Sequence, residues 1–584
     1  MAALIKTLDS MTPKQVGENG LVENAWSNDL QERIVQLNFQ LVRTNSNDQI
    51  LELIKVFRSI LDDIFYTNNY NNSLESRKYL SIIYRMIANT RDIIDGKGEY
   101  YLTYILIYNL YDYSEELALY MIDRLVLSEN DVLTVDSIIF EEDKKQPYGS
   151  WKDIKYLCNQ CKDSDGNITK ERIVKHCIRL INNQLSCDFS SEKPSLLAKW
   201  IPREGSVKFG WLFTLLAQDF YSYFIKTANN DKEKLKRAIK KCHMEYRRIV
   251  AALNKKLDTT QIKQCGKEWA NIKFNNVTSI TLTKQRKAFL NLNKKGEQRS
   301  ELEDRIECAA NFNKFIEKVD KGEVVAKGQR VGLVDFCKNA YSLRVGVNDN
   351  EIKLLNAQWD NNSLQNGKLD KFIAMVDVSG SMGGDPMDAA IALGIRVAEK
   401  SALGKRILTF SQKPTWVNLD GDLGFVQMVH KVKQAGWGMT TNFFLALQMI
   451  LDGIVASKLS AEETEGMVLA IFSDMQMDEA DQSNKQTLYE NISRLYAETG
   501  VKVCGKPYSP PHILFWNLRS TTGTPNLSSQ HNTSMLSGFS PSLLNVFCEE
   551  GIEGLQQYTP WSTLLKTLAN KRYDVLDQKI QEFI

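Results

Sequence analysis

The chain of 584 residues lacks long apolar runs and contains only five histidines. The stretch "GWLFTLLA", residues 210–217, is among its longest apolar runs, well below the roughly 18 residues that a membrane-spanning helix needs. The opening "MAALIKTLDSMTPK" has no basic start followed by an apolar core, so no secretory signal is expected. No histidine lies beside an evident nucleophile, and no acid–base constellation emerges. We therefore expect a cytoplasmic, non-enzymatic protein without a membrane partner.

The ten cysteines are scattered, which favours reduced and mostly buried thiols over a disulfide framework. Cys158 and Cys161 have the C-x-x-C spacing, but their segment "IKYLCNQCKD" predicts a helix, in which one turn separates the thiols, rather than a zinc or redox site. The stretch "GVKVCGKP" has the glycine and lysine spacing of a phosphate loop. Pro507 follows in place of the Ser or Thr that would hold Mg²⁺, so nucleotide hydrolysis is not expected.

Charge is distributed unevenly along a chain that is too long for one hydrophobic core. Residues 371–584 carry 18 basic and 22 acidic side chains, whereas residues 231–300 alone carry 19 basic and 6 acidic ones. The positive excess is therefore concentrated in one segment of the first half.

Residues 28–345 space apolar side chains three or four apart almost throughout, as in "DQILELIKVFRSILDDIFY". Short polar breaks separate paired amphipathic segments, which predicts an all-α, HEAT-like helical repeat that forms a solenoid or a ring. Residues 1–27 form an N-terminal extension. Residues 346–370 are polar and rich in asparagine, and they predict a linker with one short helix.

Residues 371–558 follow a different pattern, in which short apolar runs alternate with amphipathic segments. The runs are "FIAMV" (372–376), "RILTF" (406–410), "MVLAIF" (467–472) and "HILFW" (512–516). Such strands, separated by helices, predict an α/β domain with a parallel sheet that is covered on both faces. Residues 559–584 predict a helical tail that closes the chain.

Polar side chains follow the predicted strands where a parallel sheet would bring them together. Asp377, Ser379 and Ser381 form D-x-S-x-S directly after the first strand, Asp474 follows a later strand, and Thr441 precedes a helix. Binding sites of such sheets lie at the carboxyl ends of the strands. Carboxylate and hydroxyl oxygens suit a hard cation such as Mg²⁺. For D-x-S-x-S alone, a capped helix start is the alternative interpretation.

These five residues, taken in order, resemble the metal-ion-dependent adhesion site (MIDAS) of the von Willebrand factor A domain, an α/β, Rossmann-like fold. The resemblance implies that the serines and Thr441 bind the metal directly, while Asp377 and Asp474 act largely through water. It also implies an open coordination position for a carboxylate of a protein partner. Thr440, next to Thr441, leaves a one-residue ambiguity.

Several stretches of the first half resemble the TROVE module of Ro-type RNA-binding proteins. They are "ANTRDIIDGKGEYYLTY" (88–104), "PYGSWKDIKYL" (147–157), "SLLAKWIPREGS" (195–206) and "YRRIVAALNKKLDTTQI" (246–262). The whole chain most resembles a family, found in eukaryotes and large DNA viruses, that joins a TROVE-like repeat to a von Willebrand A domain. The resemblance implies a helical ring whose hole takes RNA ends and whose basic outer face takes structured RNA. Asp95 departs from the glycine common in Ro proteins.

Basic residues recur on successive helical turns in the positive segment, which predicts phosphate contacts with little sequence preference. The candidates are Lys234, Arg237, Lys240, Lys241, Arg247, Arg248, Lys255, Lys256, Lys284, Arg286 and Lys287, followed by Lys294 and Lys295. Nearby aromatic residues offer stacking surfaces for unpaired bases; they are Tyr246, Trp269, Phe274 and Phe289. A solvated basic face over core aromatics is the alternative.

Two functions follow as hypotheses. The first is an RNA-binding, ribonucleoprotein scaffold of Ro type that carries a magnesium adhesion site. The alternative is a metal-dependent protein–protein interaction scaffold without RNA binding, with a viral structural or virion-associated protein as one form of it.

Overall fold

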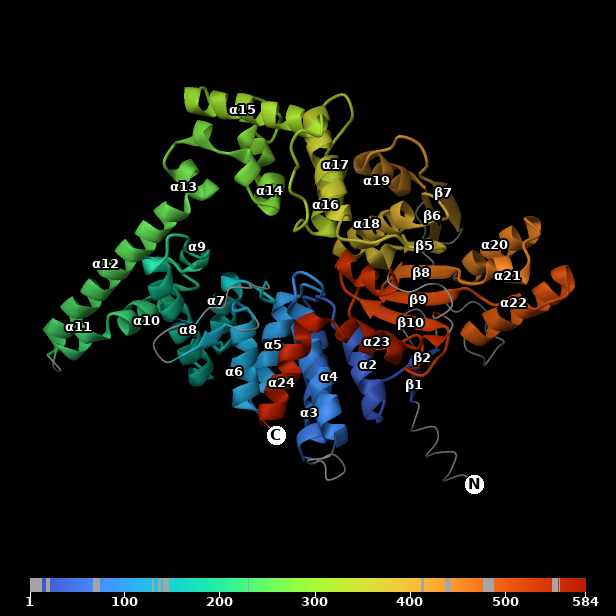
Figure 1. Cartoon of the computed structure of the whole chain (residues 1–584), viewed down its shortest axis with the longest axis horizontal. Coiled ribbons are helices and arrows are strands. Elements are labelled where there is room, and N and C mark those ends of the chain that lie inside the picture. Colours follow the sequence, from blue (N-terminus) through green and yellow to red (C-terminus); the bar gives the residue numbers. More distant parts are fainter. Residues whose placement is uncertain are drawn as a thin grey trace.

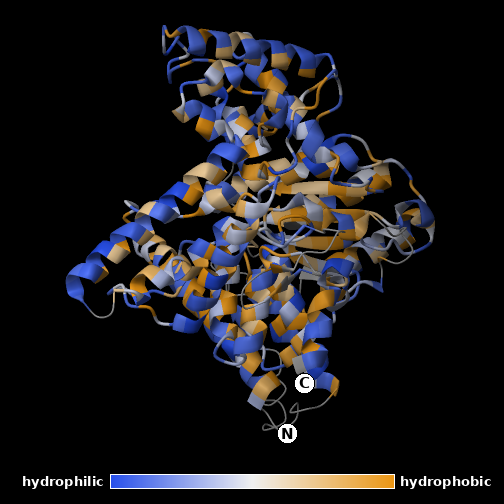
Figure 2. Cartoon of the chain, turned by 60° about the vertical axis from the view of Figure 1, so that its left-hand side comes forward, coloured by the Kyte–Doolittle hydropathy of each residue, from blue (hydrophilic) through white to orange (hydrophobic). Residues whose placement is uncertain are grey.

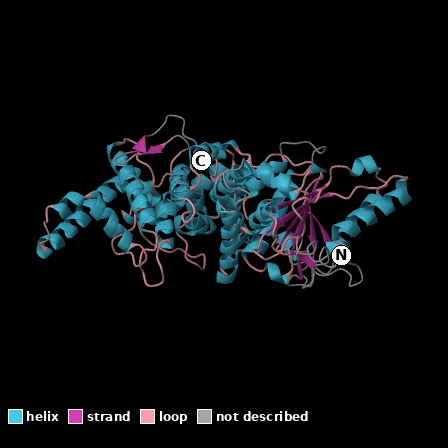
Figure 3. Ribbon diagram, turned by 90° about the horizontal axis from the view of Figure 1, so that it is seen from below, coloured by secondary structure: helices cyan, strands magenta, loops and turns pink. Residues whose placement is uncertain are grey.

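The computed structural model describes residues 13–16, 22–66, 74–128, 131–134, 138–139, 146–228, 231–410, 414–435, 443–475, 488–521, 523–548, 555 and 557–583. The protein is mostly helical, with one six-stranded sheet near the C-terminal end of the chain (Figures 1 and 3). Among the residues described, no helix is long and apolar enough to cross a membrane.

Helices make up most of the chain before the sheet, as the apolar spacing predicts. They are α2 (Leu30–Gln40), α3 (Asn47–Tyr66), α4 (Leu74–Arg91), α5 (Tyr100–Leu110), α6 (Glu115–Arg124), α7 (Trp151–Gln160), α8 (Glu171–Ser190), α9 (Leu197–Trp200), α10 (Gly210–Phe220), α11 (Ser222–Lys226), α12 (Lys232–Leu257), α13 (Thr260–Cys265), α14 (Ser279–Phe289), α15 (Glu303–Asp320), α16 (Leu333–Tyr341) and α17 (Asp349–Ser363). Two short hairpins also occur, β1 (Lys14–Val16) with β2 (Val22–Asn24) and β3 (Val132–Leu133) with β4 (Ile138–Ile139).

Side-chain caps explain where several of these helices begin. The Asp29 carboxylate accepts the backbone N–H of Glu32 at the start of α2, and Ser150 and Asp153 form a reciprocal capping box at α7. Asp231 caps α12, the 26-residue helix that carries much of the positive segment. Such caps satisfy backbone N–H groups that lack a partner within the first helical turn.

The helices follow a path that returns to the sheet (Figure 1). α12 leads from the first helices to a separate group made by α13, α14 and α15, which has its own small apolar core around Phe289 and Phe312. α16 and α17 then lead back, and α16 packs on the sheet helix α18 (Asp385–Lys400). Figure 2 shows that apolar residues concentrate on the strands and the helices beside them.

The sheet has the order β10-β9-β8-β5-β6-β7, with every pair parallel except β6 and β7. Its strands are β5 (Phe372–Asp377), β6 (Arg406–Phe410), β7 (Thr415–Asn418), β8 (Val468–Ser473), β9 (His512–Asn517) and β10 (Thr533–Ser537). Helices α18 (Asp385–Lys400), α19 (Phe425–Gln434), α20 (Phe443–Ala456), α21 (Ala461–Thr464) and α22 (Leu488–Cys504) lie between them in the chain. The sheet therefore confirms the predicted α/β arrangement, although the edge pair β6 and β7 is antiparallel where a parallel sheet was expected.

Both faces of the sheet are covered, which explains the uninterrupted apolar runs. Ala374 and Val376 of β5 pack into the core with α16, α18 and α19, whereas Ile373 and Met375 belong to the core shared with the first helices. The approach of α18 to β5 requires glycine at 394, because a Cβ there would lie 2.4 Å from a methyl group of Val376.

The segment expected to be a linker forms the 15-residue helix α17, packed into the molecule. Trp359 is fully buried and stacks on Phe425 at 3.9 Å between ring centroids. The polar composition has a structural reason: the amides of Gln358 and Asn362 are buried and donate to the backbone carbonyls of Lys327 and Val331. These amides pair with backbone carbonyls of an adjoining loop, so the polar side chains of this segment do not indicate exposure.

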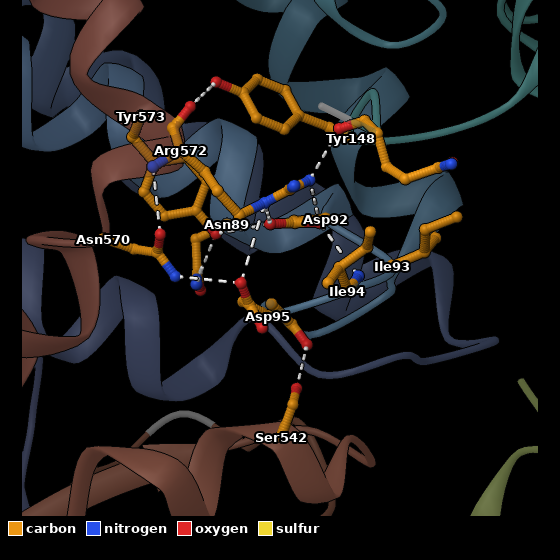
Figure 4. A network of polar contacts seen from close by, with 12 residues as sticks. Asn89, Asp92, Ile93, Ile94, Asp95, Tyr148, Ser542, Asn570, Arg572 and Tyr573 are labelled. Carbon is orange, nitrogen blue, oxygen red and sulfur yellow. Dashed lines mark hydrogen bonds and ion pairs between the residues drawn. The ribbon is translucent and has the colours of Figure 1, made fainter. Parts of the chain in front are cut away.

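The C-terminal tail forms α23 (Pro560–Leu568) and α24 (Asp574–Phe583), and both helices pack against α4 (Figure 1). Between them, the guanidinium of Arg572 binds both carboxylate oxygens of buried Asp92, at 2.9 and 3.1 Å (Figure 4). The Tyr573 hydroxyl donates to the same carboxylate at 3.1 Å, and the Asn570 amide donates to Asp95. The tail thus holds the loop that follows α4 in place through these hydrogen bonds.

That loop also contacts the sheet. The ammonium of Lys97, fully enclosed, donates to the Ser537 hydroxyl at 2.6 Å and to the Leu41 carbonyl at 3.3 Å. Ser537 ends β10 and Leu41 follows α2. A single side chain therefore joins the loop, the end of a helix and the carboxyl edge of the sheet.

Candidate functional site

The predicted metal ligands gather at the carboxyl ends of two neighbouring strands. Asp377 is the last residue of β5, and Asp474 directly follows β8, which pairs with β5 in parallel. Both carboxylates are fully buried, and Ser379 is 2% exposed. The structure thus brings together four of the five predicted side chains. Thr441 and its neighbour Thr440 lie outside the described residues.

A small set of hydrogen bonds holds these oxygens in place. The backbone N–H of Ser379 donates to Asp377 Oδ1 at 2.9 Å, and the hydroxyls of Ser379 and Ser381 lie 3.0 Å apart. The Ser473 hydroxyl donates to Asp377 Oδ2 at 2.6 Å and accepts the N–H of Met475 at 3.0 Å. Ser473 was not predicted, although a hydroxyl as the last strand residue before Asp474 is a signal that could have revealed it.

The electrostatics of the site favour a bound cation. Burial raises the pKa of Asp377 to about 6, and the negative charge of Asp474 adds to the rise, against the lowering by hydrogen bonds from Ser473 and Ser379. Two buried carboxylates at adjacent strand ends are unfavourable when both are ionised. A divalent cation between them would remove this repulsion.

Arg519 already supplies one positive charge, since its Nη1 lies 3.3 Å from Asp474 Oδ2. The arginine follows β9, where the N–H of Leu518 donates to the Ser473 carbonyl at 3.0 Å. The Asn517 amide donates to the carbonyl of Phe39 in α2, also at 3.0 Å. The helical half thus helps to place Arg519 at the site. No pattern in the sequence pointed to this arginine.

The donor set fits magnesium rather than a soft metal. Within the described ranges, no group of three or more His, Cys, Asp or Glu side chains could hold a metal ion. The candidate site offers two carboxylates and two serine hydroxyls, which are hard oxygen donors and leave room for water ligands. The chemistry of these residues is therefore compatible with Mg²⁺, while thiolate or imidazole coordination has no basis here.

Most of the predicted basic residues lie on the surface. The exposed ones are Lys234, Arg237, Lys240, Lys241, Arg247, Arg248, Lys255 and Lys256 on α12, and Lys284, Lys287, Lys294 and Lys295 on or after α14. Several have local partners: Arg247 pairs with Glu204, and Arg248 pairs with Glu245 at 2.9 Å.

Arg286 is a correction to the predicted basic surface, because it is buried. Its Nε lies 2.7 Å from a carboxylate oxygen of buried Glu351, and its Nη1 donates to the Asn339 side chain and the Thr283 carbonyl. The arginine therefore joins α14 to α16 and α17 and has no access to a nucleic acid.

Three of the four candidate stacking residues are likewise core residues. Phe274 and Phe289 contact each other at 5.3 Å in the core of the α14–α15 group, and Tyr246 is fully buried. Trp269 is partly buried, with the Arg305 guanidinium 3.8 Å from its ring centroid. The expectation that these rings stack on bases was wrong for the three buried ones, because aromatics at helical spacing form the core.

Cys158 and Cys161 are buried along α7, and Cys161 follows its last residue. The predicted helix is therefore confirmed.

Comparison with known proteins gives a family model and a viral relative. The family model "Domain of unknown function (DUF7788)" matches residues 371–577. "Uncharacterized protein L728" of Acanthamoeba polyphaga mimivirus is 26% identical over 509 residues, which cover 84% of this chain and 79% of the viral protein. The match to the viral protein includes residues of both the helical part and the sheet part, because 509 residues exceed the length of either part alone. The family model begins one residue before β5 and ends in α24, so it includes the tail together with the sheet.

Proposed function

We propose that the chain is a non-enzymatic binding scaffold in which a divalent cation, held at the sheet, takes a carboxylate from a protein partner. The convergence of Asp377, Ser379, Ser381 and Asp474 at adjacent strand ends carries this proposal. When bound, Mg²⁺ would supply a Lewis-acidic position for an anionic side chain. The likeness to the von Willebrand factor A adhesion site supports the same interpretation.

The sheet topology gives a physical reason for a site at this place. From the carboxyl end of β5 the chain crosses to β6 on one side, whereas from the carboxyl end of the neighbouring strand β8 it crosses to β9 on the other side. The two crossover connections therefore diverge between the carboxyl ends of β5 and β8. Open α/β sheets bind their ligands at such a switch point, because a crevice forms between the diverging connections.

Metal titration tests this proposal. We expect Mg²⁺ or Mn²⁺ to bind the full chain at one site, and the exchanges Asp377→Asn and Asp474→Asn each to remove binding. Asp452→Asn, which changes an exposed carboxylate on α20, is the matched control and should bind normally. Equal affinity in all four proteins would reject the site. Partner capture that EDTA leaves unchanged would reject the metal-dependent role.

A second candidate function, RNA binding of Ro type, is favoured by the exposed basic face of α12. Lys240 and Lys255 are exposed and form no ion pair within the described part of the chain, so their charges are available to phosphates. We expect structured RNA to bind more weakly as salt rises, because binding releases counterions. Lys240→Glu with Lys255→Glu should reduce affinity at least tenfold at low salt. Unchanged affinity would exclude this face.

A further inference from the structure

Four lysines gather where α7 meets α9 and the segment before α10. They are Lys152 and Lys155 on α7, Lys199 on α9, and Lys208, two residues before α10. α7 and α9 pack side by side (Figure 1). None of the four lysines forms an ion pair with any residue that the structure describes. Within the described residues, this place therefore carries four lysine charges that no salt bridge neutralises.

Aromatic rings lie close to these ammonium groups. The Lys152 Nζ lies 5.3 Å from the ring centroid of Tyr100 and 5.4 Å from that of Tyr156. The Lys155 Nζ lies 5.3 Å from the Trp200 ring. Lys155 and Lys208 also approach the buried ring of Phe209, and Lys208 lies 5.2 Å from Tyr156. We call these four lysines and four rings the lysine–aromatic cluster.

The lysine charges of the cluster are not neutralised by ion pairs with the described residues. Lys155 and Lys199 are half-buried, and burial lowers the pKa of both; the charge of Lys152 lowers that of Lys155 further. Cation–π contacts contribute only about 0.5–1 kcal/mol each at exposed sites. They do not neutralise the charges, so a bound polyanion would relieve the mutual repulsion.

We propose that the lysine–aromatic cluster binds an unpaired nucleic-acid strand, with phosphates on the ammonium groups and bases against the accessible rings. Tyr100 is 48% exposed and Trp200 is partly exposed, so both offer a stacking surface. Bases within a duplex are already stacked and hidden, whereas those of a single strand can lie on aromatic rings. An acidic polypeptide would use the ammonium groups but gain nothing comparable from the rings.

This inference rests on the RNA-binding candidate function, but it assigns different residues and a different state of the strand. The α12 face offers charges that suit structured RNA, and the cluster adds rings. An experiment can therefore disprove the proposal for one site and leave the other proposal standing. An unpaired strand that contacts all four lysines should show a slope of log affinity against log salt of about −3, since each phosphate contributes about −0.7.

Binding of labelled oligonucleotides to the full chain tests the proposal. The probes are oligouridine and oligothymidine of about twelve nucleotides, a hairpin RNA, and a polyglutamate peptide. We expect both unpaired strands to bind at least tenfold more tightly than the peptide. Equal or tighter binding of the peptide would overturn the proposal and indicate an acidic protein partner. Absence of binding by both unpaired strands at low salt would overturn it as well.

Three variants and one control separate charge from stacking. Lys152→Ala with Lys208→Ala should make the salt slope less steep by about 1.4 and weaken unpaired-strand binding about tenfold. The matched control replaces two exposed lysines of α15, Lys314→Ala with Lys318→Ala, and should change neither. Tyr100→Ser should weaken binding without changing the slope, and Tyr100→Phe should restore it.

The two nucleic-acid proposals give different patterns of results. If the hairpin binds and loses affinity only on charge reversal of α12, while unpaired strands do not bind, the cluster proposal alone fails. If unpaired strands bind and respond only to the cluster variants, the α12 face fails. Equal loss in the α15 control would reject the cluster assignment, because binding would then follow overall charge.

Discussion

Replacing Asp377 with asparagine should stabilise the metal-free protein at neutral pH. Burial raises the pKa of this carboxyl from its ordinary 3.8 to about 6. Two pKa units correspond to about 3 kcal/mol of difference between the two protonation states. The ionised carboxylate therefore destabilises the metal-free fold by about that amount at neutral pH. Asparagine carries no charge, but it weakens the bond from Ser473 by about 1 kcal/mol.

The sign of the pH dependence follows from linkage. An acid whose pKa is raised on folding contributes stability that is complete below its unfolded pKa. That stability is lost as the pH rises through the folded pKa. For Asp377 the loss runs from about pH 4 to about pH 6. The stability of the wild-type protein relative to Asp377→Asn should therefore fall across this range, and titrating groups that do not interact with Asp377 cancel in the difference.

Urea unfolding with EDTA present measures this difference. At about pH 7.5 we expect Asp377→Asn to be more stable than wild type by about 2 kcal/mol. Magnesium at a hundred times its dissociation constant should then stabilise wild type by about 2.7 kcal/mol and leave the variant unchanged. A variant that is less stable than wild type in EDTA at this pH would refute the reasoning, as would equal magnesium effects.

Three further predictions concern charged contacts. Arg519→Gln should strengthen magnesium binding about tenfold in a titration, because Asp474 loses a competing positive charge; weaker binding would contradict this. Arg572→Leu leaves the carboxylate of Asp92 buried without its main partner and should destabilise the protein by about 3 kcal/mol in urea, whereas a negligible loss would show that the tail is not held there. Arg286→Met should destabilise the protein by a similar amount and leave RNA affinity unchanged. A loss of RNA binding without a loss of stability would show that this arginine contacts RNA.

Local pattern was enough to predict four of the six strands of the sheet and four side chains of the site. The runs beginning at Phe372 and Val468 are apolar throughout because both faces of the sheet are covered, and this alone predicts parallel strands. Asp377 and Asp474 follow those strands directly, so their proximity also follows from the parallel topology.

The remaining features depend on contacts between distant parts of the chain. Arg519 reaches Asp474 only because β9 lies beside β8. Arg286 is buried, but its residue type and spacing are the same as those of its exposed basic neighbours. Asn362 looks like a linker residue, yet its amide is buried and donates to a backbone carbonyl of an adjoining loop. Periodicity and composition report local structure and average exposure, but not which charge or amide has a partner far along the chain.

The most direct test of the central claim is a crystal structure with Mn²⁺, read by its anomalous scattering. We predict one peak at the carboxyl ends of β5 and β8, within coordination distance of the Ser379 and Ser381 hydroxyls and near the carboxylates of Asp377 and Asp474. No peak at that place at saturating Mn²⁺, or a peak only elsewhere, would contradict the account.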